Sequence, residues 1–382
     1  MPGSPPNCTV ARSIFFYTDS GTLGGAEHAL LNLVEALDRE RWQPTLLLDD
    51  TAGAEAIAER AAGLELPLRR VGPMPLGLAG ARRVPKLARL LRAERPDVFH
   101  AHLTWPLAAK YGLAAAVLAR VPAVVATVHL IPKHEYDRSS LLQLRMLSKG
   151  VGRYIAVSRD LATELSERFR WPADKIEVVY NAVEPQRFDK PPSPALRAQL
   201  TGGRERPLVL TCARLDEQKG HPVLLRAAAE VRDAVFAFAG EGPQRGSLES
   251  QAAQLGVADR VHFLGEREDV PELLASCDVF ALPSYYEGSP ISVLEAMAAE
   301  RAVVSSAIAG TNELIEDGDS GLLVPPGDAD ALAAALQRLL SDSELRSSLG
   351  RRARERVQLE FTRDAMVRRT ERIYEELLDD GR

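Results

Sequence analysis

The sequence predicts an α/β protein with two open domains, each built around a parallel sheet. Its 382 residues are enough for two domains of ordinary size. Short apolar runs rich in Val, Ile and Phe alternate with longer segments of helical period, which is typical of strand–helix–strand units. Residues 182–207, punctuated by Pro and Gly, interrupt this alternation as an inter-domain linker does. We therefore expect a first domain over residues 1–181 and a second over residues 208–360.

Each domain contains six predicted strands. The first strand is expected at residues 13–18, and a Gly-containing loop and a helix with one apolar face follow it. The other strands of the first domain are expected at residues 45–48, 97–101, 124–127, 154–157 and 176–179. Those of the second domain are expected at residues 208–211, 235–239, 261–264, 279–282, 303–305 and 321–324. From residue 329 onward only helical period remains, so we expect C-terminal helices, the last one within residues 361–382.

The composition excludes several classes of protein. Apolar residues make up 46% of the chain and charged residues 26%, which excludes disordered and fibrous chains. No apolar run approaches the ~18 residues of a membrane helix, and the start lacks a signal-peptide pattern, so we expect a cytoplasmic protein. The cysteines Cys8, Cys212 and Cys277 share no short spacing, which argues against a disulfide framework and against a zinc site.

Charge is distributed unevenly along the chain. Residues 1–180 hold 23 basic and 19 acidic side chains, whereas the remainder holds 24 and 34. Residues 82–95 contain six basic side chains and one acidic side chain, with leucines at helical spacing between them. Such a helix could rest on an anionic membrane; alternatively, its leucines pack on the sheet and its arginines form a solvated face. The net positive excess is too small for a nucleic-acid partner.

The segment PSYYEGSPISVLE, residues 283–295, carries the strongest candidate for a ligand site. It follows a predicted strand and opens a predicted helix. Ser289 is a good N-cap, and Pro290 fits the first helical position. The free amides that follow, beginning with Ile291, can bind a phosphate group.

Charged side chains surround this predicted phosphate site. Glu287 and Glu295 flank the helix start at different depths, and each could accept hydrogen bonds from a pair of sugar hydroxyls. Residues 213–220, ARLDEQKG, follow another strand and place Arg214 and Lys219 on either side of a turn. Two such cations suit a diphosphate, because Arg offers a fork of donors and Lys a point charge. Alternatively, all four residues are ordinary surface or helix charges.

The first domain carries a glycine pair and a group of histidines. Gly24 and Gly25 follow the first strand and would let the backbone approach a phosphate or sugar closely, although such a pair can equally be only a tight turn. Their spacing differs from G-x-G-x-x-G, which disfavours a nicotinamide site. A metal site at His100, His102 and His129 is disfavoured because no carboxylate lies at ligand spacing. We interpret His129 as a hydrogen-bonding or proton-handling group.

Taken together, these motifs resemble the family-four retaining glycosyltransferases. The resemblance rests on the order and spacing of GGAE at 24–27, ATVH at 126–129, YIAVS at 154–158, VYNAV at 179–183, residues 214–219, GEGP at 240–243, FLG at 263–265 and residues 287–295. It implies the GT-B architecture, in which two Rossmann-like domains face a cleft. The second domain would bind the nucleotide sugar and the first the acceptor, and the last helix would cross back to the first domain.

The resemblance also implies roles for single residues. Arg214 and Lys219 resemble the diphosphate ligands, Glu295 the ribose ligand and Glu287 the partner of the donor-sugar hydroxyls. His129 resembles a histidine near the donor sugar, and we expect it to be catalytic together with Arg214, Lys219 and Glu287. The other expected substrate-binding residues are Gly24, Gly25, Ser289, Pro290, Ile291, Gly240, Phe263 and Leu264.

Three positions depart from the family pattern. Ala182 and Ala309 stand where glycine is usual, and Glu300-Arg-Ala302 replaces a Gly-x-Pro. These departures concern backbone detail and leave the class unchanged.

The expected function is sugar transfer from a nucleoside diphosphate sugar to a hydroxyl of a glycan, lipid-linked or small-molecule acceptor, with retention. A front-face route follows, because Glu287 and Glu295 have hydroxyl-binding roles and no carboxylate is placed as a nucleophile. Protein cations would replace a metal, so no cofactor is expected. UDP is the expected nucleotide and GDP the alternative. Other interpretations are a GT-B nucleotide-sugar epimerase and a catalytically silent sugar-nucleotide-binding subunit.

Overall fold

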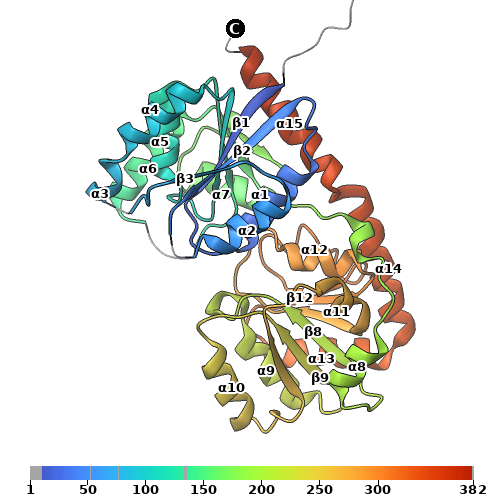
Figure 1. Cartoon of the computed structure of the whole chain (residues 1–382). Helices are drawn as coiled ribbons and strands as arrows, with labels where there is room; N and C mark the ends of the chain where they lie inside the picture. The colour runs from blue at the N-terminus through green and yellow to red at the C-terminus, as the bar shows by residue number, and fades with distance from the viewer. Residues whose placement is uncertain (1–10, 52, 76, 133–135, 381–382) are drawn as a thin grey trace, which may run out of the picture. The chain divides into compact units, whose positions relative to one another are not determined.

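Two parallel β-sheets organise the chain, one in each of two structural units (Figure 1). The structure, a computed structural model, describes residues 11–51, 53–75, 77–132 and 136–380, so Cys8 lies outside the described residues. Unit 1 combines the described residues up to Val179 with those from Arg363 onward, and unit 2 is Tyr180–Thr362. Within the described ranges, no helix is both long and apolar enough to cross a bilayer.

The sheet of unit 1 has seven strands in the order β3-β2-β1-β4-β5-β6-β7. Its strands are β1 Arg12–Thr18, β2 Trp42–Asp49, β3 Leu68–Val71, β4 Val98–Leu103, β5 Ala123–Val128, β6 Arg153–Ala156 and β7 Ile176–Val178. All residues of β4 and β5 are buried, as expected for central strands of a parallel sheet that helices cover on both faces, although β4 includes His100 and His102 among its apolar residues. The edge strand β3 was not predicted, because its sequence LRRV places two exposed arginines between its apolar residues.

Helices cover both faces of this sheet. They are α1 Gly25–Ala36, α2 Glu55–Gly63, α3 Leu78–Ala81, α4 Val84–Glu94, α5 Lys110–Ala119, α6 Arg138–Gly150, α7 Arg159–Glu167 and α15 Arg363–Asp380, with the short 3-10 helix η1 Ala173–Lys175. Because side chains alternate along a strand, Phe15 and Tyr17 join the core under α4 to α7. Phe16 points to the opposite face, where its ring contacts His100, which contacts Tyr374 of α15.

The C-terminal helix α15 is part of unit 1. The ring of Tyr374 meets the ring of Trp42 edge-on, with centroids 5.4 Å apart. Arg41 pairs with Glu371 at 3.2 Å, and Arg363 at the start of the helix pairs with Glu35 at 2.7 Å. A buried aromatic contact with ion pairs at both sides therefore attaches this helix to the unit.

The sheet of unit 2 has six strands in the order β10-β9-β8-β11-β12-β13. Its strands are β8 Leu208–Cys212, β9 Val235–Ala239, β10 Val261–Gly265, β11 Val279–Leu282, β12 Ala302–Ser306 and β13 Leu322–Val324. Its helices are α8 Pro194–Thr201, α9 His221–Glu230, α10 Arg245–Gln254, α11 Val270–Ser276, α12 Ile291–Ala298, α13 Ala329–Ser341 and α14 Ser343–Glu360, with the 3-10 helices η2 Pro185–Phe188 and η3 Glu217–Lys219. The buried thiols of Cys212 and Cys277 are free.

The structure differs from the expected linker at residues 182–207. This segment forms η2 and α8, and Phe188 and Leu200 are buried in the core of unit 2. Pro185 and Pro194 stand in the first turn of their helices, where proline is favourable because its missing amide would have no partner there. Two of the prolines that suggested a linker are therefore helix-start signals, whereas Pro191 and Pro192 lie in the connection between η2 and α8.

Candidate functional site

The loops after β8 and β11 bring predicted site residues together in unit 2. These two strands are neighbours in the sheet, so their carboxyl ends open at the same edge. Gly220 has a φ of +65°, and a Cβ at this position would lie 2.0 Å from the carbonyl oxygen of Pro283. Only glycine fits this approach, which places the β8–α9 loop directly against the β11–α12 loop.

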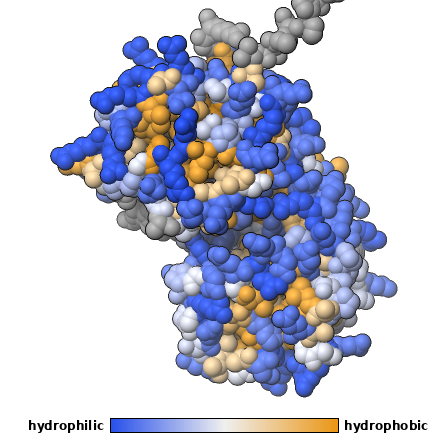
Figure 2. Space-filling view, viewed as in Figure 1, coloured by the Kyte–Doolittle hydropathy of each residue, from blue (hydrophilic) through white to orange (hydrophobic). Residues whose placement is uncertain are grey.

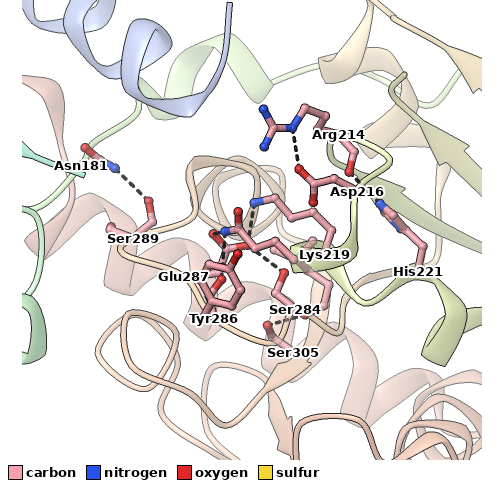
Figure 3. A network of polar contacts seen from close by, with 12 residues as sticks. Asn181, Arg214, Asp216, Lys219, His221, Ser284, Tyr286, Glu287, Ser289 and Ser305 are labelled. Carbon is pink, nitrogen blue, oxygen red and sulfur yellow. Dashed lines mark hydrogen bonds and ion pairs between the residues drawn. The ribbon is translucent and has the colours of Figure 1, made fainter. Parts of the chain in front are cut away.

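Lys219 and Glu287 form an ion pair across these two loops (Figure 3). Nζ of Lys219 lies 2.6 Å from Oε1 of Glu287, and the side chains are 19% and 6% exposed. A charge-assisted hydrogen bond of this length, largely withdrawn from water, is among the stronger polar contacts in proteins. The predicted diphosphate cation and the predicted sugar-binding carboxylate therefore lie side by side.

Two further side chains hold the carboxylate of Glu287. The hydroxyl of Ser284 donates to Oε1 at 2.7 Å, and the amide nitrogen of Gln218 donates to Oε2 at 3.2 Å. Gln218 also donates to the carbonyl of Tyr286 at 2.9 Å. Both oxygens of Glu287 are thus engaged, which fixes the orientation of the carboxylate at the loop tip.

Arg214 lies in the same loop as Lys219 but has a different partner. Its Nε donates to Asp216 at 2.5 Å, while the Arg214 side chain remains 58% exposed. The backbone carbonyl of Arg214 accepts a hydrogen bond from Nε2 of the buried His221 at 2.9 Å. Burial lowers the pKa of His221 to about 4, so this imidazole is neutral near pH 7. Its hydrogen bond to the carbonyl of Arg214 holds the backbone of the β8–α9 loop. The guanidinium of Arg214 therefore keeps donors available to a ligand.

The helix α12 begins one residue later than the sequence indicates. Pro290, with a φ of −70° and a ψ of 115°, is the N-cap, whereas Ser289 was expected there. The amides of Val293 and Leu294 are directed to the carbonyl of Pro290, which leaves the earlier amide of Ile291 without a partner inside the helix. Within the part of the chain that the structure describes, the buried hydroxyl of Ser289 has no hydrogen-bond partner. Amides and a free hydroxyl at a helix start suit an anion.

Asn181 fixes the backbone of this loop. Its side-chain amide donates to the carbonyl of Ser289 at 2.8 Å. This long-range contact gives a structural reason for the asparagine of the VYNAV motif, whose function could not be assigned from sequence.

Glu295 lies on α12, more than one turn inside the helix. Burial raises the pKa of this carboxyl group to about 7, and the charge of Arg187 lowers it in part. A carboxyl group with this pKa changes charge near neutral pH. It can accept hydrogen bonds from hydroxyl groups fully only when ionised.

The remaining predicted residues of unit 2, Gly240, Phe263 and Leu264, lie in or directly after the neighbouring strands β9 and β10. Gly240 has a φ of +144°, and a Cβ there would lie 2.1 Å from the carbonyl of Ala213, so the turn requires glycine. Phe263 and Leu264 belong to β10 and are half-buried. The ring of Phe263 contacts the ring of Phe238, with centroids 5.1 Å apart.

In unit 1, a buried glutamate organises the glycine loop. Gly24 is the N-cap of α1, and the helix begins at Gly25. Glu27 is 2% exposed; it accepts from the amide of Gly24 at 3.0 Å and from the hydroxyl of Thr18 at 3.2 Å. A Cβ placed on Gly25 would meet no atom within 4 Å, so local packing does not demand glycine there.

His129 ends a chain of buried imidazoles in unit 1. Its Nε2 lies 3.0 Å from Nδ1 of His102. His100 lies two residues before His102 on β4, and so on the same face of the sheet. It contacts the hydroxyl of Tyr374 at 2.6 Å and that of Thr127 at 2.8 Å. Among the described residues, Nδ1 of His129 has no hydrogen-bond partner. Burial lowers the pKa of His129 to about 3, so it is a neutral hydrogen-bonding group rather than a cation near pH 7.

Among the residues that the structure describes, no group of three or more His, Cys, Asp or Glu side chains is arranged to hold a metal ion. The partners of His100 are hydroxyl groups instead of carboxylates.

The sequence predicted the charged residues of the site but not the residues that hold them in position. Ser284, Gln218 and Glu27 position predicted site residues, yet none was singled out. Ser284 is the second residue after β11, and Gln218 directly precedes Lys219, so each lay within a recognised motif. Their roles depend on contacts across loops, which spacing along the chain does not reveal.

Two family models match the chain, one over most of its first half and one within unit 2. Residues 23–187 match the model of Glycosyltransferase Family 4, and residues 193–356 match that of Glycosyl transferases group 1.

Individual relatives extend this likeness. The chain is 30% identical over 313 residues to the UDP-Gal:alpha-D-GlcNAc-diphosphoundecaprenol alpha-1,3-galactosyltransferase of Escherichia coli, covering 77% of this chain and 78% of that protein. It is 34% identical over 229 residues to an uncharacterized glycosyltransferase of Methanocaldococcus jannaschii, and this match spans 58% of this chain and only 59% of that relative.

A solved structure shares the fold. The Anabaena protein HepE, in complex with UDP-glucose, aligns with a TM-score of 0.83 and 26% identity over 96% of this chain and 99% of that chain. With the two parallel sheets, this likeness confirms the GT-B fold class that the sequence predicts.

Proposed function

The chain belongs to the family-4 glycosyltransferases, and from this premise we propose that it transfers a hexosyl group from a UDP-sugar to an acceptor hydroxyl with retention. The ion pair between Lys219 and Glu287 is the observation that carries the proposal. It sets a phosphate-binding cation beside a carboxylate whose oxygens suit sugar hydroxyls. Relatives support the choice of UDP, because one is named for UDP-Gal and the Anabaena structure contains UDP-glucose.

The donor would lie along the carboxyl edge of the unit 2 sheet. Arg214 and Lys219 would bind the diphosphate, together with the amides at the start of α12. Glu295 would accept from the ribose hydroxyls and Glu287 from hydroxyls of the sugar. Lys219 would then contact both the diphosphate and Glu287, which couples the two halves of the donor.

The reaction proceeds on one face of the sugar. The acceptor oxygen bonds to the anomeric carbon on the side from which UDP leaves, so configuration is retained. As the carbon–oxygen bond to the β-phosphate breaks, the acceptor proton passes to a leaving phosphate oxygen. Arg214 and Lys219 stabilise the charge that develops there, a contribution on the order of 3 kcal/mol per well-placed donor.

Glu287 supports a front-face route instead of a covalent intermediate. Its two oxygens are already engaged by Lys219, Ser284 and Gln218. A carboxylate held in this way is a weak nucleophile but an oriented acceptor for hydroxyl groups. The protein cations supply the charge that a divalent metal would otherwise supply, so activity would need no metal.

Unit 1 would bind the acceptor. The neutral His129 and the open backbone at Gly25 offer uncharged hydrogen-bonding groups, which suit sugar hydroxyls. A lipid-linked glycan is the acceptor class we favour, because the E. coli relative is named for a diphosphoundecaprenol-linked substrate.

A thermal-shift panel of UDP-, GDP- and ADP-sugars tests the donor, followed by mass spectrometry with polyprenyl diphosphate-linked and soluble sugars. We expect a UDP-sugar to stabilise the protein most and one acceptor to gain the mass of one hexose. Conversion of the nucleotide sugar without an acceptor would indicate an epimerase. Stabilisation with no turnover for any acceptor class would indicate a silent binding subunit.

A further inference from the structure

Three neighbouring helices of unit 1, α4, α5 and α6, form a strongly basic surface. With the residues that flank them, 82–95, 110–120 and 137–150, they contain eleven basic side chains and two acidic side chains. All of the basic residues except Lys110 are exposed. Of the acidic residues, Glu94 is paired with Arg69 at 3.7 Å, and Asp137 caps α6 by accepting from the backbone amide of Ser140 at 2.7 Å. Unit 1 therefore concentrates uncompensated positive charge on this α4–α6 surface.

The same surface exposes large apolar side chains. Leu142 and Met146 are 59% and 66% exposed on α6, and Val117 and Leu118 are exposed on α5. Leu142 and Met146 are four residues apart, so they project from one stripe of the helix. Figure 2 shows hydrophobic side chains among hydrophilic ones over the region of α4 to α6.

The apolar contribution comes from α5 and α6, not from α4. From the sequence, this helix could rest on a membrane, or its leucines could pack on the sheet. Leu87 and Leu91 are buried in the core of unit 1. The helix α4 thus adds only its basic face. Lys110 of α5 donates to Gln143 of α6 at 3.1 Å, and Arg92 of α4 donates to the carbonyl of Leu118 at 2.6 Å. These contacts hold the three helices together as one surface.

We propose that the α4–α6 surface docks on an anionic lipid bilayer. Charge complementarity identifies the partner. Exposed Lys and Arg side chains are attracted to anionic headgroups, and few acidic side chains lie on the α4–α6 surface to weaken this attraction. Isolated Leu and Met side chains between long cationic ones are the pattern of helices that lie in a membrane interface. The inference rests on the proposed function in one respect, which is that docking would bring unit 1 to a lipid-linked acceptor.

Vesicle flotation tests this docking directly. At low salt, the protein should float with vesicles of phosphatidylcholine and phosphatidylglycerol but not with phosphatidylcholine alone, and high salt should weaken binding at least about tenfold. The triple variant Lys86→Glu, Arg89→Glu, Arg145→Glu should bind at least about tenfold more weakly. The double variant Leu142→Ser, Met146→Ser should bind several-fold more weakly at any salt concentration, because it removes inserted apolar area.

Matched controls come from unit 2. The triple variant Arg204→Glu, Arg232→Glu, Arg338→Glu changes net charge by the same amount on exposed positions, and Leu359→Ser removes a leucine that is 81% exposed. Both should float like the unmodified protein, and circular dichroism should show that every variant is folded.

The docking proposal would be overturned by a lack of flotation with anionic vesicles at low salt, or by an equal loss of binding in the control triple variant. Binding to an acidic polypeptide or to RNA without vesicle binding would point to another partner and would also overturn it. Transfer to a soluble acceptor should be unchanged in the α4–α6 variants. If flotation succeeds while no transfer occurs in any variant, the proposed function fails and the docking surface stands.

Discussion

Removing Lys219 should destabilise unit 2 as well as stop turnover. The ammonium group lies 2.6 Å from a carboxylate that is 6% exposed, so Lys219→Ala leaves a buried charge without its ionic partner. Breaking a buried pair costs about 3–5 kcal/mol. The remaining hydrogen bonds from Ser284 and Gln218, with the partial exposure of Lys219, reduce this to about 2 kcal/mol. For a unit of this size, that corresponds to a fall in Tm of about 4–8 °C.

Calorimetric unfolding of a double-mutant cycle checks the magnitude. Lys219→Ala, Glu287→Ala and the double variant should show a coupling energy of about 2 kcal/mol, because the double variant leaves no charge unpaired. Turnover of Lys219→Ala should fall at least about a hundredfold, since a leaving-group contact is lost. Arg232→Ala, an exposed position in the same unit, is the control and should change neither quantity. Additive effects within about 0.5 kcal/mol would refute the buried ion pair.

Three further predictions follow from the same contacts. The pKa of Glu295 is about 7 in the native state, against an ordinary value of 4.5. Between these pH values the native state binds more protons than the unfolded state, so the free energy of unfolding falls as the pH rises from about 4.5 to about 7. Glu295→Gln should therefore stabilise the protein by up to about 3 kcal/mol near pH 8 but not near pH 4, as measured by urea denaturation; an unchanged pH dependence would contradict this. Glu300 has a φ of +58° and is exposed, so Glu300→Gly should raise stability by about 0.5–1 kcal/mol, and a lower Tm would count against that reasoning. Transfer should persist in EDTA, and loss that magnesium restores would show that a metal is required.

The sequence predicted the sheets well because both are buried on their two faces. Every strand with a continuous apolar run was found, including β9 and β11 with their full extent. The edge strand β3 was missed because half of it faces solvent as arginine. Residues 182–207 were interpreted as a linker because proline is common both at helix starts and in coil. The burial of Phe188 and Leu200 in the core of unit 2 shows that this segment is folded, and this packing is not visible in the sequence.

The candidate site was predictable in its residue types but not in its contacts. Motif spacing pointed to Lys219 and Glu287, while their direct pairing depends on Gly220 letting two loops touch. The N-cap shifted from Ser289 to Pro290 because proline takes an extended ψ there. The neutrality of His129 is a consequence of burial, which a strand pattern alone does not quantify.

Calorimetric titration with UDP shows whether unit 2 binds the nucleoside diphosphate of a sugar donor. The titration is best made near pH 8, above the pKa of Glu295, so that this carboxylate is ionised. UDP should bind the unmodified protein, and Glu295→Ala should weaken its affinity at least about tenfold, because the ribose contacts are lost. Glu287→Ala should leave UDP affinity within about threefold, because this residue serves the sugar. Equal loss of UDP affinity in the two variants, or no binding of UDP to the unmodified protein, would contradict the account.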